Sequence, residues 1–303
     1  MAARVAERQS QLVLGLDPDP GSLWPVAAAS AAERHAPLHP AAAAVLGHCL
    51  ALIDATADAC VAVKLQLARF EVLGGDGWVV MGALAAHARR SRLLVIADGK
   101  RGDIDVSAGA YASAEIGGLD TPHGRLEGLG ADLVTVNPLM GRDTIEPFID
   151  AARRAGAGVL ALVRTSNPGA ADIEDLRLEG GGSVWEAIAA MVDELGRGGI
   201  GEAGLSDVGA VLGATAPGNL ARARELMAHA TFLLPGVGAQ GGRVEDLAAA
   251  FAPGRAGGLV TASRSIAEAH RAGGPDPPTA ARAEAERLRD AAWKCSSRAL
   301  RTA

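Results

Sequence analysis

Short apolar runs bounded by turn-forming residues alternate along the chain with longer, alanine-rich segments. The short runs are typical of buried strands, and the longer segments have the periodicity of helices. Strands are expected at residues 11–17, 60–66, 92–100, 131–138, 157–168, 208–215, 231–238 and 257–263. Helices are expected at residues 40–57, 76–90, 104–116, 142–154, 183–196, 217–229, 243–251 and 278–300.

This alternation predicts an α/β fold in which each of eight strands is followed by a helix, a single closed (β/α)8 TIM barrel. A doubly wound open sheet is the alternative, but the first turn, GLDPDPG, is not a GxGxxG dinucleotide loop. Residues 1–303 are expected to form one domain, since no linker or internal repeat divides them. Residues 18–39 and 117–130 are expected to be loop insertions, residues 176–184 a candidate mobile lid, and residues 278–300 a C-terminal helix.

Composition and charge narrow the classes of function. The 303 residues are 49% hydrophobic and 21% charged, which is enough to bury a full core. A net charge of -6 argues against nucleic acid as a partner, because phosphate backbones require clustered basic residues. No apolar run approaches the roughly 18 residues of a membrane span, and we expect no signal peptide. Cys49, Cys60 and Cys295 lack metal-ligand spacing and are expected to be buried or reduced thiols of a cytoplasmic protein.

Lysine is rare in this sequence. Of 29 basic residues only Lys64, Lys100 and Lys294 are lysines, and arginine is used everywhere else. A lysine kept against this bias indicates a place where a compact ammonium is required. Lys294 lies in the tail and is expected at the surface, whereas Lys64 and Lys100 lie in predicted strands.

Polar residues gather at the ends of the predicted strands, where TIM barrels build their active sites. Asp98 and Lys100 alternate on one face of the third strand, so both are expected to point the same way. Asp103 comes where the next helix starts. The remaining strand-end residues are Asp17, Lys64, Asn137, Ser166, Asn167, Gln240 and Arg264. Two purely structural interpretations stay open here: an ion pair for Asp98 with Lys100, and a helix N-cap for Asp103.

Two loops after the seventh and eighth strands have the character of a phosphate site. Residues 233–242 are rich in glycine and residues 259–269 lead directly into a helix, so backbone amides of both loops could bind an anion. Arg264 would add a forked cationic contact. The alternative is that the glycines only form tight turns and that Arg264 is a surface charge. The joint location of the two loops and Arg264 favours a phosphate site. No cluster of residues has metal-ligand spacing, so we expect no metal.

The segment DGKRGDI, residues 98–104, resembles the DxKxxDI signature of orotidine 5'-phosphate decarboxylases. Six further segments follow in the order and spacing of the longer bacterial (type 2) branch of that family: VLGLDPDP, AVKLQLARFEVLG, TVNPLMGRDTIEPF, VRTSNPGA, LLPGVGAQGG and ASRSI. The resemblance covers about residues 10–270. The DxKxxDI signature alone is shared with relatives of other chemistry, but the whole set is specific.

The resemblance implies a reaction and a catalytic set. The reaction would be the cofactor-free conversion of orotidine 5'-phosphate to uridine 5'-phosphate in pyrimidine biosynthesis. Asp98 would lie against the substrate carboxylate, and Lys100 would protonate C6. Lys64 would bridge the ribose and the acidic network. An ammonium beside C6 can both stabilise a developing carbanion and give up a proton, which arginine does not readily do.

The resemblance also implies how the nucleotide is bound and that the protein is a homodimer. Asp17 would hold a ribose hydroxyl, Ser166 with Asn167 would bind the substrate near the pyrimidine, and Gln240 with Arg264 would hold the phosphate. Asp103 and Ser107 would be contributed to the active site of the partner subunit.

Three positions depart from the family pattern. Gly99 stands where alanine or serine is common, which is sterically harmless but makes the backbone more flexible. Ser107 stands where a threonine is common, and Leu139 where an aromatic residue is expected. The competing functions are a metal-dependent sugar-phosphate aldolase, a Schiff-base aldolase that uses Lys64 or Lys100, and a non-catalytic phosphate-binding barrel.

Overall fold

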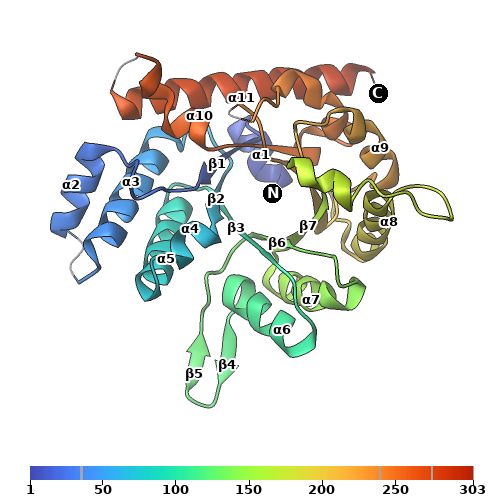
Figure 1. Cartoon of the computed structure of the whole chain (residues 1–303), viewed down its shortest axis with the longest axis horizontal. Coiled ribbons are helices and arrows are strands. Elements are labelled where there is room, and N and C mark those ends of the chain that lie inside the picture. Colours follow the sequence, from blue (N-terminus) through green and yellow to red (C-terminus); the bar gives the residue numbers. More distant parts are fainter. Residues whose placement is uncertain (35–36, 239, 274–275, 303) are drawn as a thin grey trace.

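The barrel of this protein is formed by eight parallel strands that close on themselves in the order β1-β10-β9-β8-β7-β6-β3-β2 (Figure 1). The computed structural model describes residues 1–34, 37–238, 240–273 and 276–302. Closure of the sheet confirms the predicted TIM barrel and excludes the open doubly wound sheet. The strands of the barrel are β1 (Leu12–Leu16), β2 (Ala62–Gln66), β3 (Leu94–Arg101), β6 (Leu133–Val136), β7 (Gly158–Arg164), β8 (Val208–Leu212), β9 (Phe232–Leu234) and β10 (Gly258–Ala262).

Helices surround the strands and follow the predicted order, with local differences in their type. The segment predicted as a helix at 104–116 is an α-helix only to residue 112 and then widens into a π-helix, and the segment 243–251 is a 3-10 helix. The α-helices are α1 (Ala2–Arg8), α2 (Pro25–Arg34), α3 (Pro40–Thr56), α4 (Leu67–Glu71), α5 (Gly75–Arg90), α6 (Asp105–Ala112), α7 (Glu146–Ala155), α8 (Val184–Gly196), α9 (Gly218–Leu226), α10 (Arg264–Ala267) and α11 (Pro277–Thr302). The other helices are the π-helix η1 (Ser113–Gly117) and the 3-10 helices η2 (Arg142–Thr144), η3 (Pro168–Asp172), η4 (Arg197–Gly199), η5 (Val244–Phe251), η6 (Arg255–Gly257) and η7 (Ala269–Ala272).

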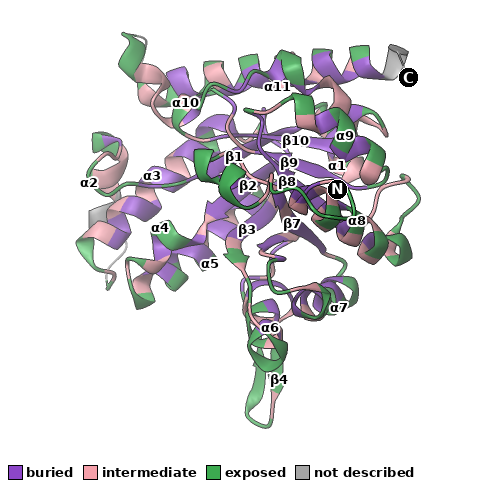
Figure 2. Ribbon diagram, turned by 45° about the vertical axis from the view of Figure 1, so that its right-hand side comes forward, coloured by how far each residue is buried: buried purple, intermediate pink, exposed green. Residues whose placement is uncertain are grey.

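Two apolar layers hold the barrel together, and the strands are buried between them (Figure 2). Alternate side chains of β3 belong to different layers: Val95 and Ala97 pack outward against helices, and Ile96 packs inside the barrel. This alternation explains why Asp98, two residues after Ile96, faces the barrel interior. At the opposite end of the barrel Val5 of α1 joins the interior cluster, so α1 closes the floor.

Three segments add to the basic barrel. The expected insertion 117–130 contains a two-stranded hairpin, β4 (Leu119–Thr121) with β5 (Gly124–Leu126), which projects away from the barrel in Figure 1. The expected insertion 18–39 contains α2, which packs on α3. The long helix α11 packs along α3 and η5. Residues 35–36 of the first insertion and 239 of the expected phosphate loop lie outside the described residues.

Within the described ranges, no helix is long and apolar enough to cross a membrane.

Candidate active site

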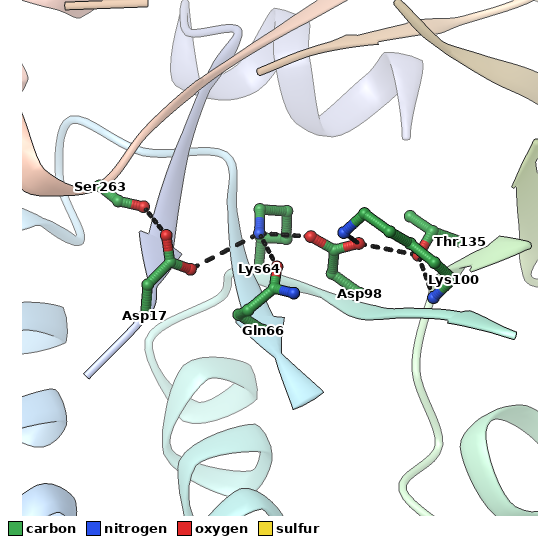
Figure 3. A network of polar contacts seen from close by, with 7 residues as sticks. All are labelled: Asp17, Lys64, Gln66, Asp98, Lys100, Thr135 and Ser263. Carbon is green, nitrogen blue, oxygen red and sulfur yellow. Dashed lines mark hydrogen bonds and ion pairs between the residues drawn. The ribbon is translucent and has the colours of Figure 1, made fainter. Parts of the chain in front are cut away.

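Four charged side chains alternate in sign across the carboxyl-terminal end of the barrel (Figure 3). Asp17 follows β1 and Lys64 lies on β2, and the Lys64 Nζ is 3.7 Å from Asp17 Oδ1. The same Nζ is 2.6 Å from Asp98 Oδ2 on β3. Lys100 Nζ is 2.6 Å from Asp98 Oδ1, so a single carboxylate separates the two ammonium groups. Four of the strand-end positions predicted from the sequence therefore meet in one network.

Lys64 is the buried member of the pair of lysines. Its side chain is only 6% exposed, and its ammonium also donates to Gln66 Oε1 at 3.2 Å. Burial would lower the pKa of Lys64, but Asp98 and Asp17 outweigh it and raise the pKa above its ordinary value. The charged form of Lys64 is therefore favoured by two hydrogen-bond acceptors, Asp98 and Gln66, and by the nearby Asp17 carboxylate.

Asp98 is held ionised by its surroundings. Burial opposes its ionisation, but the charges of Lys64 and Lys100 outweigh this and lower its pKa to about 2. The hydroxyl of Thr135 on β6 adds a third bond and donates to Asp98 Oδ1 at 2.8 Å. Thr135 was not among the predicted residues, although it is the only polar side chain in the apolar run LVTV of β6.

Lys100 differs from Lys64 in exposure and in backbone conformation. Its side chain is 40% exposed, and Asp98 is the one acceptor of its ammonium among the described residues. Its φ is +48°, in the left-handed region that side chains other than glycine rarely adopt. The Lys100 amide donates to Thr135 Oγ1 at 2.9 Å, which helps to hold this conformation.

A cavity of about 410 Å³ opens above these charges. Leu162, Val211 and Leu233 give it an apolar wall beside the polar groups, as is usual for small-molecule sites. Thr261 and Ser263 of the last strand and its loop also line it, and were not predicted. The predicted residues that line the cavity are Asp17, Lys64, Asp98, Lys100, Ser166, Asn167, Gln240 and Arg264.

The glycine-rich loop after β9 is folded partly onto itself. Gly236 and Gly238 have φ values of +102° and +79°, which glycine adopts without strain. The amides of Gly238, Gly241 and Gly242 donate to carbonyl oxygens within the loop. Those three amides are therefore not free for an anion, which corrects the expectation that the loop as a whole offers its amides to phosphate.

The cationic end of the cavity is formed by Arg264 at the start of α10. Within the described part of the chain its guanidinium has no hydrogen-bond or ion-pair partner, and the residue is exposed. Ser166 and Gln240 line the same cavity, and Ser166 donates to Gln240 Oε1 at 3.2 Å. A free guanidinium in one cavity with an amide and a hydroxyl is a suitable environment for a phosphate group.

Asp103 and Ser107 do not line the cavity. Among the described residues, Asp103 accepts only from the amide of Ile104, at 2.8 Å, and it does not cap a helix, because the N-cap of α6 is Ile104. Ser107 is exposed. Around them Ile104 and Val106 are 58% and 80% exposed. The segment that follows β3 thus lies outside the cavity of its own chain and exposes apolar side chains.

Leu139, at the position where the family pattern has an aromatic residue, is 69% exposed and does not line the cavity. Its amide donates to Asn137 Oδ1 at 3.0 Å. The leucine therefore forms no part of the cavity wall in this chain.

Comparison with known proteins agrees with this site. The model of the "Orotidine 5'-phosphate decarboxylase / HUMPS family" matches residues 10–283. The orotidine 5'-phosphate decarboxylase of Rhodopirellula baltica is 42% identical over 230 residues, covering 76% of this chain and 75% of the relative. That of Deinococcus radiodurans is 40% identical over 264 residues, covering 87% and 86%.

A solved structure, that of Leishmania donovani OMP decarboxylase, is similar throughout. It superimposes with a TM-score of 0.70 at 29% sequence identity and covers 97% of this chain and 98% of its own. The matched family model spans most of the chain and includes every member of the charged network. The chain therefore belongs to the orotidine 5'-phosphate decarboxylase / HUMPS family.

Proposed function

We infer that this protein is an orotidine 5'-phosphate decarboxylase of pyrimidine biosynthesis, and we propose that Lys100 protonates C6 of the substrate. The family membership and the relatives above support the reaction. The exposure of the two ammonium groups and the number of acceptors around each favour Lys100 over Lys64 as the proton donor. Both line the cavity, but Lys64 is buried and has two hydrogen-bond acceptors and the Asp17 carboxylate around it, whereas Lys100 is more exposed and has one acceptor among the described residues.

The proposed reaction needs one proton and no redox partner. The bond between C6 and the carboxylate carbon breaks, carbon dioxide leaves, and the electron pair stays on C6. A proton moves from Lys100 Nζ to C6, and the neutral amine then takes a proton from water. The positive charge of Lys100 next to C6 stabilises the developing carbanion before the transfer.

Asp98 has two roles in this proposal. Its carboxylate holds the Lys100 ammonium in position at 2.6 Å. It would also lie against the substrate carboxylate, and repulsion between two carboxylates is relieved when one leaves as carbon dioxide. Lys64 neutralises the second oxygen of Asp98 and ties it to Asp17.

The rest of the cavity would bind the nucleotide away from the reacting carbon. Arg264 and Gln240 would hold the phosphate, Ser166 with Asn167 the pyrimidine edge, and Asp17 a ribose hydroxyl. Contacts at a distance from C6 supply binding energy that lowers the barrier at the reacting centre.

A direct assay tests the proposal. Lys100→Ala should lower the rate of uridine 5'-phosphate formation by at least about 1,000-fold, since it removes both the proton donor and the stabilising charge. Lys294→Ala, at an exposed position of α11, is the matched control and should be fully active. Full activity of Lys100→Ala would disprove its role. The assay is run with and without a chelator, because a metal-dependent aldolase would lose activity with it.

The Schiff-base alternative requires a neutral lysine amine in the resting site. The raised pKa of Lys64 acts against a neutral amine there, and the Lys100 amine is held by its contact with Asp98 at 2.6 Å. Treatment with substrate and borohydride should therefore leave both lysines unmodified.

We further propose a homodimer in which Asp103 and Ser107 complete the site of the partner. The position of both residues outside their own cavity, next to exposed Ile104 and Val106, supports this arrangement. Mixing inactive Asp103→Ala and Lys100→Ala subunits should restore part of the activity, since one hybrid site would contain all groups. No recovery despite proven subunit exchange would count against shared sites.

Three wider assignments complete the proposal. We propose that the whole chain is one domain, supported by the packing of α1 and α11 on a barrel whose strands run from Leu12 to Ala262. We propose that it belongs to the longer bacterial branch, supported by the nearly equal coverage of both chains in the Deinococcus radiodurans comparison. A cytoplasmic location is supported by three buried, unpaired cysteines.

A further inference from the structure

The outer face of β3 has a second cluster of charges that the proposed mechanism does not use. Arg101 follows Lys100 and points away from the cavity into the helical layer, where its Nε donates to Glu115 Oε1 at 2.9 Å. A second nitrogen of Arg101 bonds to Glu71 of α4. The guanidinium also lies over the ring of Tyr111, 4.9 Å from its centroid. Arg101 thus links β3 to the helices on both sides of it.

Glu115 is an unusual residue to find at this place. It lies in the π-helix η1, it is fully buried, and its Oε2 has no hydrogen-bond partner among the described residues. Burial raises its pKa to about 7, although Arg101 acts in the opposite direction. A π-turn often marks a functional position. A buried carboxyl with an unpaired oxygen lowers the stability of the fold, so its presence calls for a functional explanation.

The Glu115 carboxyl lies directly against the backbone between the two central residues of the site. A Cβ atom added at Gly99 would be 2.8 Å from Glu115 Oε1, 3.0 Å from Arg101 Nε and 3.1 Å from Leu67 Cδ2. The glycine therefore lets the ion pair pack on the peptide that joins Asp98 to Lys100. Gly99 is enclosed on this side, so the expected gain in flexibility at this position is restricted by contact.

The backbone at this point is strained and needs to be held. The register between β3 and β6 shifts between Ala97 and Arg101, and Lys100 within the shift has a φ of +48°. A left-handed conformation of this kind is unfavourable for a residue other than glycine and persists where the surroundings enforce it. On the inside Thr135 accepts from the Lys100 amide. On the outside the Arg101 carbonyl accepts from Asn137 at 2.7 Å, and the side chain of Arg101 is fixed by Glu115 and Glu71.

We propose that Arg101 and Glu115 are positioning residues for Lys100. Their ion pair, packed against Gly99 on the outer face of β3, holds the left-handed turn that directs the Lys100 ammonium into the cavity. Neither residue touches the cavity, so they act on the reaction only through the strand. This inference rests on the proposed role of Lys100.

Glu115→Gln is the primary test, because it keeps the shape of the side chain and removes its charge. Displacement of a reacting group by a fraction of an ångström to 1 Å is expected to lower kcat by about 10- to 100-fold. KM and the affinity for uridine 5'-phosphate should change less than about twofold, since the groups proposed to bind the nucleotide are untouched.

The dependence of kcat on pH provides a readout that a merely structural role would not change. As the pH rises through about 7, Glu115 ionises and its bond to Arg101 becomes an ion pair and stronger. The kcat of the wild type should therefore rise through this range, and the corresponding step should be missing from Glu115→Gln.

Asp207→Asn is the matched control. It removes the carboxylate of another arginine ion pair, Arg153 Nε to Asp207 Oδ2 at 2.7 Å, which lies just before β8 at the floor of the barrel. Its kcat should stay within twofold of the wild type. Equal losses in the two variants, or a kcat of Glu115→Gln within twofold of the wild type, would overturn the proposal.

A second variant covers the case in which Glu115→Gln does not fold. Glu71→Gln removes the more exposed carboxylate of Arg101 and should lower kcat at least about threefold, again without a change in KM. An unchanged kcat of Glu71→Gln would then overturn the proposal. If Lys100→Ala is fully active, the proposed function of Lys100 fails instead, so the two failures are distinguishable.

Discussion

Thr135 is the residue whose replacement tests the architecture of the site most directly. Its hydroxyl donates to the Asp98 carboxylate at 2.8 Å and accepts from the Lys100 amide at 2.9 Å, and it is fully buried. Thr135→Val keeps the volume of the side chain and removes both bonds. The amide of Lys100 and one oxygen of Asp98 then each lose a partner.

The magnitude follows from the two bonds. A hydrogen bond to a charged group contributes about 1.5–3 kcal/mol, and a buried amide without a partner costs about 1–3 kcal/mol. The unfolding free energy of Thr135→Val should therefore fall by about 3–5 kcal/mol. For a chain of this size that corresponds to a decrease in Tm of roughly 6–10 °C. The kcat should fall as well, since the turn at Lys100 loses its inner support.

Urea unfolding monitored by circular dichroism measures the change, and the chain provides its own control. Thr261 on β10 is also buried, but its hydroxyl has no hydrogen-bond partner among the described residues. Thr261→Val should leave the unfolding free energy unchanged or raise it slightly. If the unfolding free energy falls equally in both valine variants, the loss is caused by replacing threonine with valine in a barrel strand. The reasoning about the two hydrogen bonds is then refuted.

Three further predictions concern buried charges. Because its pKa is depressed to about 2, Asp98 stabilises the fold fully above about pH 4, and about 2 kcal/mol of this should be lost as the pH falls toward 2. Asp98→Asn should remove that part of the acid dependence measured by urea unfolding, and an unchanged slope would contradict the assignment. The effect of Glu115 on the pH dependence of stability has the opposite sign. Because its pKa is raised to about 7, the unfolding free energy should fall by about 3 kcal/mol as the pH rises from about 4.5 to 7. Glu115→Gln should flatten this decline. Arg224 is buried, donates to the carbonyls of five residues and stacks on Phe232, so Arg224→Met should lower the unfolding free energy by about 3–5 kcal/mol. The exposed Arg222→Met is its control, and an equal loss there would show that the carbonyl contacts contribute nothing.

The sequence allowed the barrel and most of its cavity to be predicted, because both depend on periodicity. Alternation along the third strand placed Asp98 and Lys100 on one face, and the order of strands and helices placed distant residues such as Asp17 and Arg264 at one end of a barrel. These inferences need no knowledge of side-chain conformations.

The residues that were missed depend on local geometry instead. A single threonine in an apolar strand is common, so nothing in the sequence distinguished Thr135 from an ordinary strand residue. Glu115 fell within a segment predicted as a regular helix, and only the π-turn directs its carboxyl onto Gly99. The amides of the glycine-rich loop were expected to be free, but the loop folds so that three of them bond within it.

The closure of the barrel has a consequence for how the protein is made. β1 pairs with β10, Gln11 donates to Ser296 in α11, and the interior cluster unites Val5 with Leu259 and Trp293. While the ribosome still holds the last helix, the first strand lacks one neighbour and the floor of the barrel is open. Such distant pairings fold slowly. The nascent chain therefore exposes apolar strand edges until β10 and α11 have left the ribosome, which is the interval in which it most needs protection from aggregation.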